Sequence, residues 1–249
     1  MADIADAITL GRFRAPDLVV TAKGDGSPVS DADRAAEQAV RDRLGADRPD
    51  DAILGEEFGA AGGGGDGGGR RWVLDPIDGT KNYVRGIPVW GNLIALEEDG
   101  VPVVGVVSAP ALGRRWWAAR EEGAYADGGP IRVSAVADLA DAHLSYDNFG
   151  GFEAHGLAPG AHALERACRR TRGFGDFWSH VLVAEGAVDV AVEPEVAHWD
   201  MAAVQVIVEE AGGRFTDVQG RRRPDGGSGV STNGRLHDEV LAILGGAQA

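Results

Sequence analysis

Hydrophobic and polar residues alternate differently in the two parts of this chain. Between Trp90 and Val133 short apolar runs are separated by turn residues such as Glu98-Asp99-Gly100 and Asp127-Gly128-Gly129, which predicts an antiparallel meander. Its expected strands are Asn92–Leu96, Val101–Val107, Arg115–Ala119 and Ile131–Val133. Further along, helical and strand patterns alternate. We therefore expect an α+β subdomain over residues 1–140 and a smaller α/β subdomain over residues 141–249.

Helix signals are clearest where a capping residue precedes an apolar face. Ser30 begins such a helix, and Gly45 is its expected stop. Trp116 and Trp117 are adjacent and so point to opposite faces of a strand, which suggests a sheet covered on both sides. The other expected helices lie in the first dozen residues and at Ala161–Arg170, Phe177–Glu185, Trp199–Ala211 and Leu236–Leu244. The other expected strands lie at Leu18–Lys23, Val188–Val192 and Val230–Thr232, and two more begin at Ile53 and at Trp72.

Composition narrows the partners of the protein. In 249 residues, 39 acidic side chains exceed 24 basic ones, giving a formal charge of −15 that argues against nucleic acid and anionic membranes as partners. A phosphate ester would also be repelled unless bound cations reversed the local field. Cys168 is the single cysteine, so no intrachain disulfide can form, and a reducing compartment is the simpler assumption. Because no basic leader and no apolar run of ~20 residues is present, we expect a soluble, cytoplasmic protein.

The stretch from Trp72 to Asn82 carries the candidate chemistry. An apolar run ends in Asp75 and Asp78, with Pro76 between them, and Gly79 and Thr80 follow where a helix could open. Two carboxylates beside outward-facing N–H groups can hold a divalent cation next to a phosphate. The alternative from the residues alone is that an aspartate simply caps a helix.

Two further acidic positions have similar local alternatives. Asp33 stands three residues after Ser30, as a capping-box partner does. Glu56 and Glu57 end a short strand, and by itself such a pair is common in solvated loops.

The order of three motifs resembles the inositol monophosphatase superfamily of magnesium-dependent phosphatases. They are Gly-Glu-Glu at 55–57, Asp-Pro-Ile-Asp-Gly-Thr at 75–80, and Trp-Asp-Met-Ala-Ala at 199–203 followed by Glu-Ala-Gly-Gly at 210–213. The resemblance implies an α/β (α+β) fold, a layered αβαβα sandwich whose antiparallel first half and α/β second half share one catalytic cleft, and a homodimer. It also implies two to three Mg²⁺ ions held by Glu56, Asp75, the carbonyl of Ile77, Asp78 and Asp200, with Asp33 near the loosest ion.

The resemblance assigns catalytic roles as well. Glu56 and Thr80 would orient and deprotonate the attacking water, Asp78 would act within the same machinery, and the N–H groups of Gly79 and Thr80 would hold the phosphate. Lys23 serves the phosphate or only balances the acids. Glu57 is either a participant or a solvated neighbour.

The residues expected to bind the alcohol half of the substrate lie mostly outside these motifs. Glu193, seven residues before Asp200, matches a substrate-side glutamate of the family, and Asp200 itself also faces the substrate. Gly175, Asp176 and His198 fall in matching neighbourhoods. Each has a structural alternative: a helix cap for Asp176, a strand-end charge for Glu193 and a packing contact for His198.

Two runs, Thr80–Trp90 and Gly173–His180, look most like the histidinol-phosphatase branch of the superfamily. That branch would convert L-histidinol phosphate and water to L-histidinol and phosphate in histidine biosynthesis. The alternatives are an inositol monophosphatase or broad sugar-phosphate phosphatase, and a non-catalytic binding protein of the same fold. A missing metal carboxylate or Thr80 would favour the last, but each expected position is filled. The glycine tract Gly62–Gly69 is expected to be a spacer loop or an active-site flap.

Overall fold

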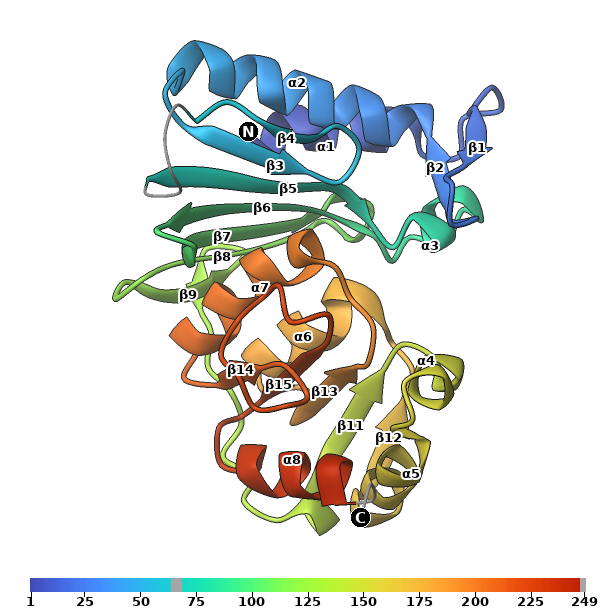
Figure 1. Cartoon of the computed structure of the whole chain (residues 1–249), viewed down its shortest axis with the longest axis vertical. Coiled ribbons are helices and arrows are strands. Elements are labelled where there is room, and N and C mark those ends of the chain that lie inside the picture. The colour runs from blue at the N-terminus through green and yellow to red at the C-terminus, as the bar shows by residue number, and fades with distance from the viewer. Residues whose placement is uncertain (64–68, 247–249) are drawn as a thin grey trace.

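The computed structural model describes residues 1–63 and 69–246, which form five alternating layers of helices and strands (Figure 1). The expected layered αβαβα sandwich is therefore confirmed. Most of the glycine tract lies outside the described residues, so its expected role stays a prediction. No helix in the described parts of the chain combines the length and apolar character needed to cross a membrane.

An eight-stranded sheet forms the upper β layer in Figure 1. Its strands, in spatial order, are β10 (Gly129–Pro130), β9 (Gly123–Ala126), β8 (Arg114–Ala119), β7 (Val101–Ala109), β6 (Gly91–Glu98), β5 (Arg70–Asp78), β3 (Ala52–Gly55) and β4 (Gly59–Ala61). The pairs from β6 to β10 are antiparallel, as the meander pattern predicted. β5 also pairs antiparallel with β6, whereas β3 lies parallel to β5. A separate hairpin of β1 (Val20–Ala22) and β2 (Pro28–Ser30) extends from this half.

A five-stranded sheet forms the lower β layer. Its order is β12 (Arg170–Arg172), β11 (His143–Tyr146), β13 (Val190–Glu193), β15 (Gly229–Thr232) and β14 (Arg214–Thr216). β11 is parallel to both of its neighbours, and the pairs that β15 makes are antiparallel.

The helices form three layers around the two sheets. α1 (Ala2–Arg12) and α2 (Asp31–Asp47) cover one face of the large sheet, α6 (Asp176–Ala184) and α7 (His198–Glu210) lie between the sheets, and α4 (Phe149–Ala154), α5 (Ala158–Ala167) and α8 (His237–Gly246) cover the small sheet (Figure 1). α3 (Thr80–Val84) is a short helix directly after β5, and two 3₁₀ turns occupy Pro110–Leu112 and Leu139–Asp141. The largest apolar cluster joins α6 and α7 to the large sheet around the fully buried Trp116.

Two adjacent tryptophans test the expectation of a sheet covered on both sides. Trp116 packs against Phe177 of α6, with ring centroids 6.2 Å apart. Trp117 points to the opposite face, the one that α1 covers, because Arg115 on the same side of β8 bonds to Asp3 of that helix. Trp117 is half-buried and stacks on Tyr125 of β9, with ring centroids 5.8 Å apart. Both faces are therefore covered, the second one only in part.

Three local expectations were wrong. Ile131–Val133 is no strand, because Val133 N–H bonds to the Ala211 carbonyl at the end of α7 and the segment leads to the second half. Gly45 does not stop its helix, which continues to Asp47; a glycine inside a helix costs only about 1 kcal/mol, and the burial of Leu44 offsets it. The helix expected at Ala161–Arg170 spans Ala158–Ala167, and its last expected residue instead begins edge strand β12.

Candidate active site

Strand β5 delivers two carboxylates to one side of the sheet through a bulge. Regular alternation would place residues three apart on opposite faces. The register with β6 shifts between Asp75, opposite Leu93, and Asp78, opposite Gly91, so that one extra residue is accommodated where Pro76 lies. Both side chains are buried. The bulge is thus the local feature that lets Asp75 and Asp78 face a common point.

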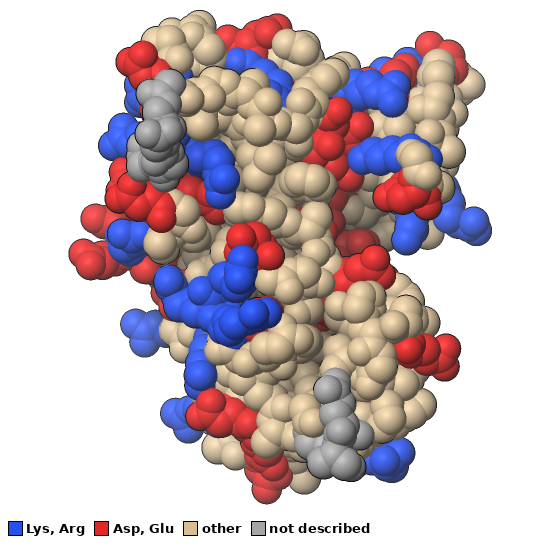
Figure 2. All heavy atoms as spheres, viewed as in Figure 1, with Lys and Arg blue, Asp and Glu red and all other residues tan. Residues whose placement is uncertain are grey.

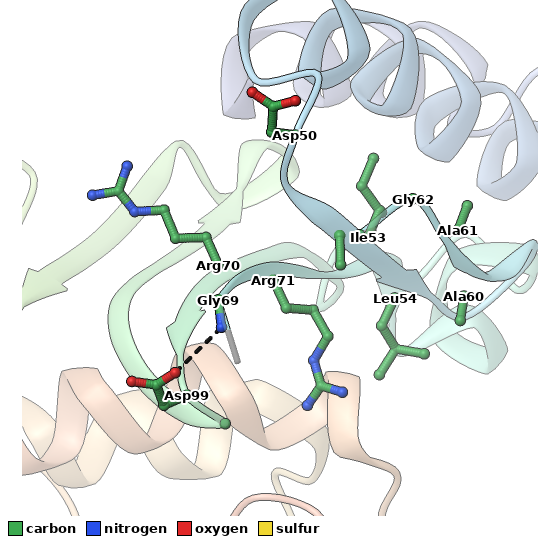
Figure 3. A pocket seen from close by; sticks show the side chains of 13 residues that line it. Asp50, Ile53, Leu54, Ala60, Ala61, Gly62, Gly69, Arg70, Arg71 and Asp99 are labelled. Carbon is green, nitrogen blue, oxygen red and sulfur yellow. Dashed lines mark hydrogen bonds between the residues drawn. The ribbon is translucent and has the colours of Figure 1, made fainter. Parts of the chain in front are cut away.

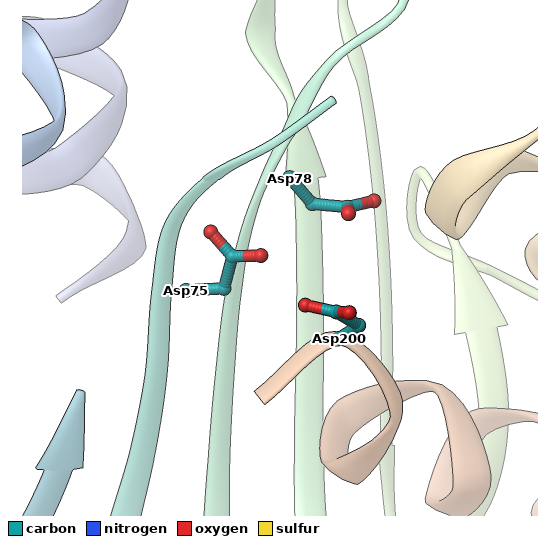
Figure 4. A group of neighbouring side chains, drawn as sticks. All are labelled: Asp75, Asp78 and Asp200. Atoms are coloured by element: carbon teal, nitrogen blue, oxygen red, sulfur yellow. The ribbon is translucent and has the colours of Figure 1, made fainter. Parts of the chain in front are cut away.

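The third carboxylate comes from the first turn of α7. Asp200 accepts a hydrogen bond from the backbone N–H of Ala197 at 2.7 Å, which fixes it at the start of the helix. Asp75, Asp78 and Asp200 each offer an oxygen within 4.8 Å of the others. Figure 4 shows the three side chains converging from the end of β5 and the start of α7. A strand of one half and a helix of the other therefore build one cluster.

Among the described residues, the three carboxylates of this cluster form no ion pair, and the nearby ammonium of Lys23 pairs with Glu56 and Glu57 instead. Burial raises the pKa values of Asp75 and Asp78 well above their ordinary range, and neighbouring acids add to the effect. Burial likewise raises the pKa of Asp200 to about 7, despite the bond from Ala197. Buried carboxylate oxygens in mutual repulsion are suited to a hard divalent cation, since such an ion replaces their lost solvation. The residues present fit a metal centre.

Glu56 faces the same cleft and is held by a lysine from the β1–β2 hairpin. Lys23 Nζ lies 2.7 Å from Glu56 Oε1 and 2.6 Å from Glu57 Oε1. Burial works against the charged lysine, but these two contacts outweigh it and raise the pKa of Lys23. The structure therefore places Lys23 and Glu57 beside Glu56, with the ammonium balancing two acids.

Thr80 links the end of β5 to the capping box of α2. Its hydroxyl lies 2.8 Å from the Ile77 carbonyl and 3.3 Å from Asp33 Oδ1. Asp33 also accepts from the backbone N–H of Ser30 at 2.8 Å, so it is the capping-box partner that its spacing indicated. Burial raises the pKa of Asp33. Asp33 thus closes the capping box and contacts Thr80 at the same time.

Gly79 and Asp176 meet across the cleft. Gly79 has φ +81°, and a Cβ there would lie 3.2 Å from Asp176 Oδ2, so the position requires glycine. Asp176 is the first residue of α6 and has φ +50°, a strained conformation for a side-chain-bearing residue. Its carboxylate accepts from Asn82 Nδ2 at 3.3 Å and does not cap the helix, which excludes the alternative of a helix cap. Burial, followed by the charge of Glu193, raises the pKa of Asp176 to about 8.

The remaining predicted substrate residues take two different positions. Glu193 ends β13, is buried, and is not among the residues that line the cleft. His198 faces the large sheet instead, where its Nε2 lies 2.6 Å from Glu97 Oε1. The structure therefore favours a packing contact over a substrate-side role for His198.

The cleft itself has a volume of about 200 Å³ and is lined from both halves of the molecule. Figure 2 shows acidic side chains in the hollow between these halves. The residues that line it are Ser27, Pro28, Glu56, Asp75, Ile77, Asp78, Gly79, Thr80, Lys81, Asp176 and Asp200. Ser27, Pro28 and Lys81 were not predicted, because their reach into the cleft depends on how the hairpin and α3 pack.

A larger pocket of about 390 Å³ lies at the opposite end of β5 (Figure 3). Its two arginines, Arg70 and Arg71, are paired with Glu98 and Glu97. Among its described lining residues no three acids gather, and so the smaller cleft is the better candidate for metal-assisted chemistry.

Known proteins resemble this chain over almost its whole length. A model of the inositol monophosphatase family matches residues 1–248. A histidinol-phosphatase of Mycobacterium tuberculosis is 56% identical and aligns with 98% of this chain and 95% of its own length. A histidinol-phosphatase of Streptomyces coelicolor is 53% identical and aligns with 98% of this chain and 94% of its own length. The solved structure of an inositol monophosphatase from Zymomonas mobilis is 35% identical, with a TM-score of 0.86 and coverage of 98% and 94%.

Proposed function

The chain belongs to the inositol monophosphatase family, and we propose that it is a Mg²⁺-dependent phosphate monoester hydrolase whose substrate is L-histidinol phosphate. The observation that carries the proposal is the 56% identity, over almost the full chain, to a protein named as a histidinol-phosphatase. The products would be L-histidinol and phosphate, and the reaction would serve histidine biosynthesis. We expect a cytoplasmic homodimer in which residues 1–140 and 141–249 are two subdomains of one catalytic unit.

The proposed metal ligands are the oxygens that the cleft gathers, namely Glu56, Asp75, the Ile77 carbonyl, Asp78 and Asp200, with Asp33 near the loosest of two to three ions. Magnesium bound there would supply positive charge to the phosphate and an acidified water. The convergence of three carboxylates, two of them buried and the third partly buried, supports this assignment, because a site of this charge requires cations before it can accept a phosphate ester.

The protein's own groups would orient the reaction. Glu56 and Thr80 would position the attacking water and take its proton, and Asp78 would act beside them. The backbone N–H groups of Gly79 and Thr80, where the chain turns from β5 into α3, would hold phosphate oxygens. Lys23 would then be free to balance the acids of the site.

The alcohol half of the substrate would lie toward Asp176 and Glu193, and Asp200 would face both halves. Histidinol carries an ammonium group and an imidazole, whereas a polyol is neutral. Two acids next to the cleft favour the cationic alcohol. The inositol monophosphatase of Zymomonas mobilis makes inositol 1-phosphate the second candidate.

A substrate panel would test the proposal directly. We expect turnover of histidinol phosphate to exceed that of inositol 1-phosphate, and both to be lost when EDTA removes Mg²⁺. A clear preference for the inositol ester would overturn the substrate assignment, and full activity in EDTA would overturn the metal assignment. Light scattering during size-exclusion chromatography would test the homodimer.

A further inference from the structure

Two buried polar atoms next to the cleft face each other without a hydrogen-bond partner among the described residues. They are Nε2 of His180, on α6, and Oε1 of Glu193, at the end of β13. His180 is fully buried and Glu193 is 6% exposed. The two atoms are 3.6 Å apart, too close for a water molecule to lie between them. Since unpaired buried polar atoms are costly, each is the natural partner of the other.

The other side of the imidazole is fixed by β15. Nδ1 of His180 lies 2.7 Å from the hydroxyl oxygen of Ser231, which is fully buried. A Cβ on Gly229 of the same strand would lie 3.6 Å from His180 Cε1, so this backbone packs against the ring edge. If the Ser231 hydroxyl donates to Nδ1, the neutral ring carries its hydrogen on Nε2, facing Glu193. Because a carboxylate oxygen can only accept, a bond between Nε2 and Glu193 Oε1 requires this tautomer.

Glu193 has a reason to need that donor. No lysine or arginine of the described chain forms an ion pair with it. Its charge acts on Asp78, Asp176 and Asp200, so it adds to the negative field of the cleft. At 3.6 Å the contact with His180 is longer than a hydrogen bond, and a movement of about 0.5 Å would close it. The second oxygen, Oε2, accepts no hydrogen bond from the described residues and, unlike Oε1, is not fully enclosed.

We propose that His180 is a positioning residue that orients the carboxylate of Glu193 toward a cationic group on the alcohol half of the substrate. The proposal deepens the proposed function and rests on it. Nε2–H holds Oε1, and this leaves Oε2 to meet an ammonium or imidazolium group. Without the donor, Oε1 would stay buried and unpaired, and the carboxylate would turn away from the substrate. His180 would therefore favour amino-alcohol phosphates over neutral polyol phosphates.

The test compares His180→Leu, which removes both nitrogens at similar size, with His180→Gln, which can return a donor near Nε2. For each variant, kcat and KM are measured at saturating Mg²⁺ with histidinol phosphate and with inositol 1-phosphate. We expect His180→Leu to raise KM for histidinol phosphate about tenfold more than for the inositol ester, and His180→Gln to recover part of this. Equal losses on both esters, or no change on either, would overturn the proposal.

A matched control is available in His237, another fully buried histidine, whose nitrogens contact Thr216 and Thr232 away from the cleft. His237→Leu should lower the melting temperature without changing the ratio of the two esters. If His180→Leu does not fold, Ser231→Ala takes its place, because it keeps the ring but releases its tautomer. It should shift the ratio in the same direction, and an unchanged ratio would count against the proposal.

A double-mutant cycle separates this proposal from the substrate assignment. It uses whichever ester the wild type hydrolyses best. In a Glu193→Gln background, His180→Leu should lower kcat/KM by less than about twofold further, because the group that it orients is already altered. Losses that multiply independently would overturn the positioning role. If the wild type prefers the inositol ester, the proposed function fails, while the cycle still decides whether His180 acts through Glu193.

Discussion

Replacing Asp200 by asparagine is expected to stabilise the metal-free protein near pH 8 while removing its response to Mg²⁺. Asparagine has nearly the same size and keeps an oxygen that can accept from Ala197 N–H, so the first turn of α7 is retained. What it removes is a charge that burial disfavours and that Glu56 and Glu193 repel. The same substitution takes away a proposed metal ligand. Stability and metal response should therefore change in opposite directions.

The size of the effect follows from the pKa of Asp200, which rises from an ordinary 3.8 to about 7 in the folded protein. Between these values the folded chain keeps a proton that the unfolded chain has lost, so its free energy of unfolding falls as pH rises through this window. Above pH ~7 the full penalty applies, about 4 kcal/mol at 1.36 kcal/mol per pH unit. Asp200 is partly exposed in the cleft wall, and solvent screening reduces this to about 2 kcal/mol.

Thermal unfolding followed by circular dichroism would measure this difference in stability between Asp200→Asn and the wild type. In EDTA near pH 8, Asp200→Asn should melt roughly 4–8 °C above the wild type, and the difference should vanish near pH 4. With Mg²⁺ at about 100 times its Kd, the wild type should gain about 2.7 kcal/mol and become the more stable protein. Asp217→Asn is the control, because Asp217 is buried among bonds from Gln219 and Arg221 and should lose stability in both conditions.

Two outcomes would refute this reasoning. If Asp200→Asn melts below the wild type in EDTA near pH 8, the buried acids are not in electrostatic conflict. If Mg²⁺ stabilises the variant as much as the wild type, Asp200 is no metal ligand.

Three other predictions concern single side chains. Asp78→Asn should abolish turnover at saturating Mg²⁺ with an unchanged circular dichroism spectrum; retained turnover would contradict its assignment. Burial lowers the pKa of His237 from 6.5 to about 4, so the neutral ring contributes its full stability above pH ~6.5. As the pH falls from ~7 to ~5, the free energy of unfolding should drop by about 2 kcal/mol, because the unfolded chain binds a proton that the folded chain does not. Urea unfolding of His237→Leu should lack this dependence on pH. Gly105→Ala would place a Cβ 2.4 Å from the Ala203 carbonyl oxygen and should destabilise the protein by about 1–3 kcal/mol. Gly45→Ala, in open space within α2, should stabilise it by about 0.5–1 kcal/mol. Equal melting temperatures for the two variants would contradict the close packing of β7 on α7.

The features predicted most reliably from the sequence are those that depend on residues close together in the chain. Asp99-Gly100 and Asp127-Gly128 both adopt positive φ, as tight hairpin turns require, and the meander between them follows the alternation of apolar residues. The motif at Asp75 and Asp78 could be recognised because one short stretch supplies both carboxylates. The bulge that turns them to the same side was not predicted and is seen only in the register of β5 against β6.

Contacts between distant segments were beyond local patterns. Nothing in the spacing from Asp78 to Asp200 indicates that they meet, and only the family resemblance placed them together. The structure brings their side chains to one point, while the catalytic roles stay predictions. Arg170–Arg172 became a strand because an open sheet edge at β11 accepted it, which no helical pattern could indicate. His180 gave no signal of its own, since its proposed role depends on contacts of this α6 residue with Ser231 of β15 and Glu193 of β13.

α7 connects the packing of the two halves to the geometry of the metal cluster. Every residue from Met201 to Val208 is buried, as expected for a helix enclosed between two sheets and not lying on a surface. The approach of β7 at Gly105 sets the depth of this helix, and the bond from His198 to Glu97 of β6 holds its first turn against the large sheet. Asp200 follows His198 by two residues, so its position relative to Asp75 is determined by how the second half docks on the first. Substitutions that loosen this docking should therefore weaken Mg²⁺ binding even where they touch no carboxylate, because the third acid of the cluster would no longer be held in place.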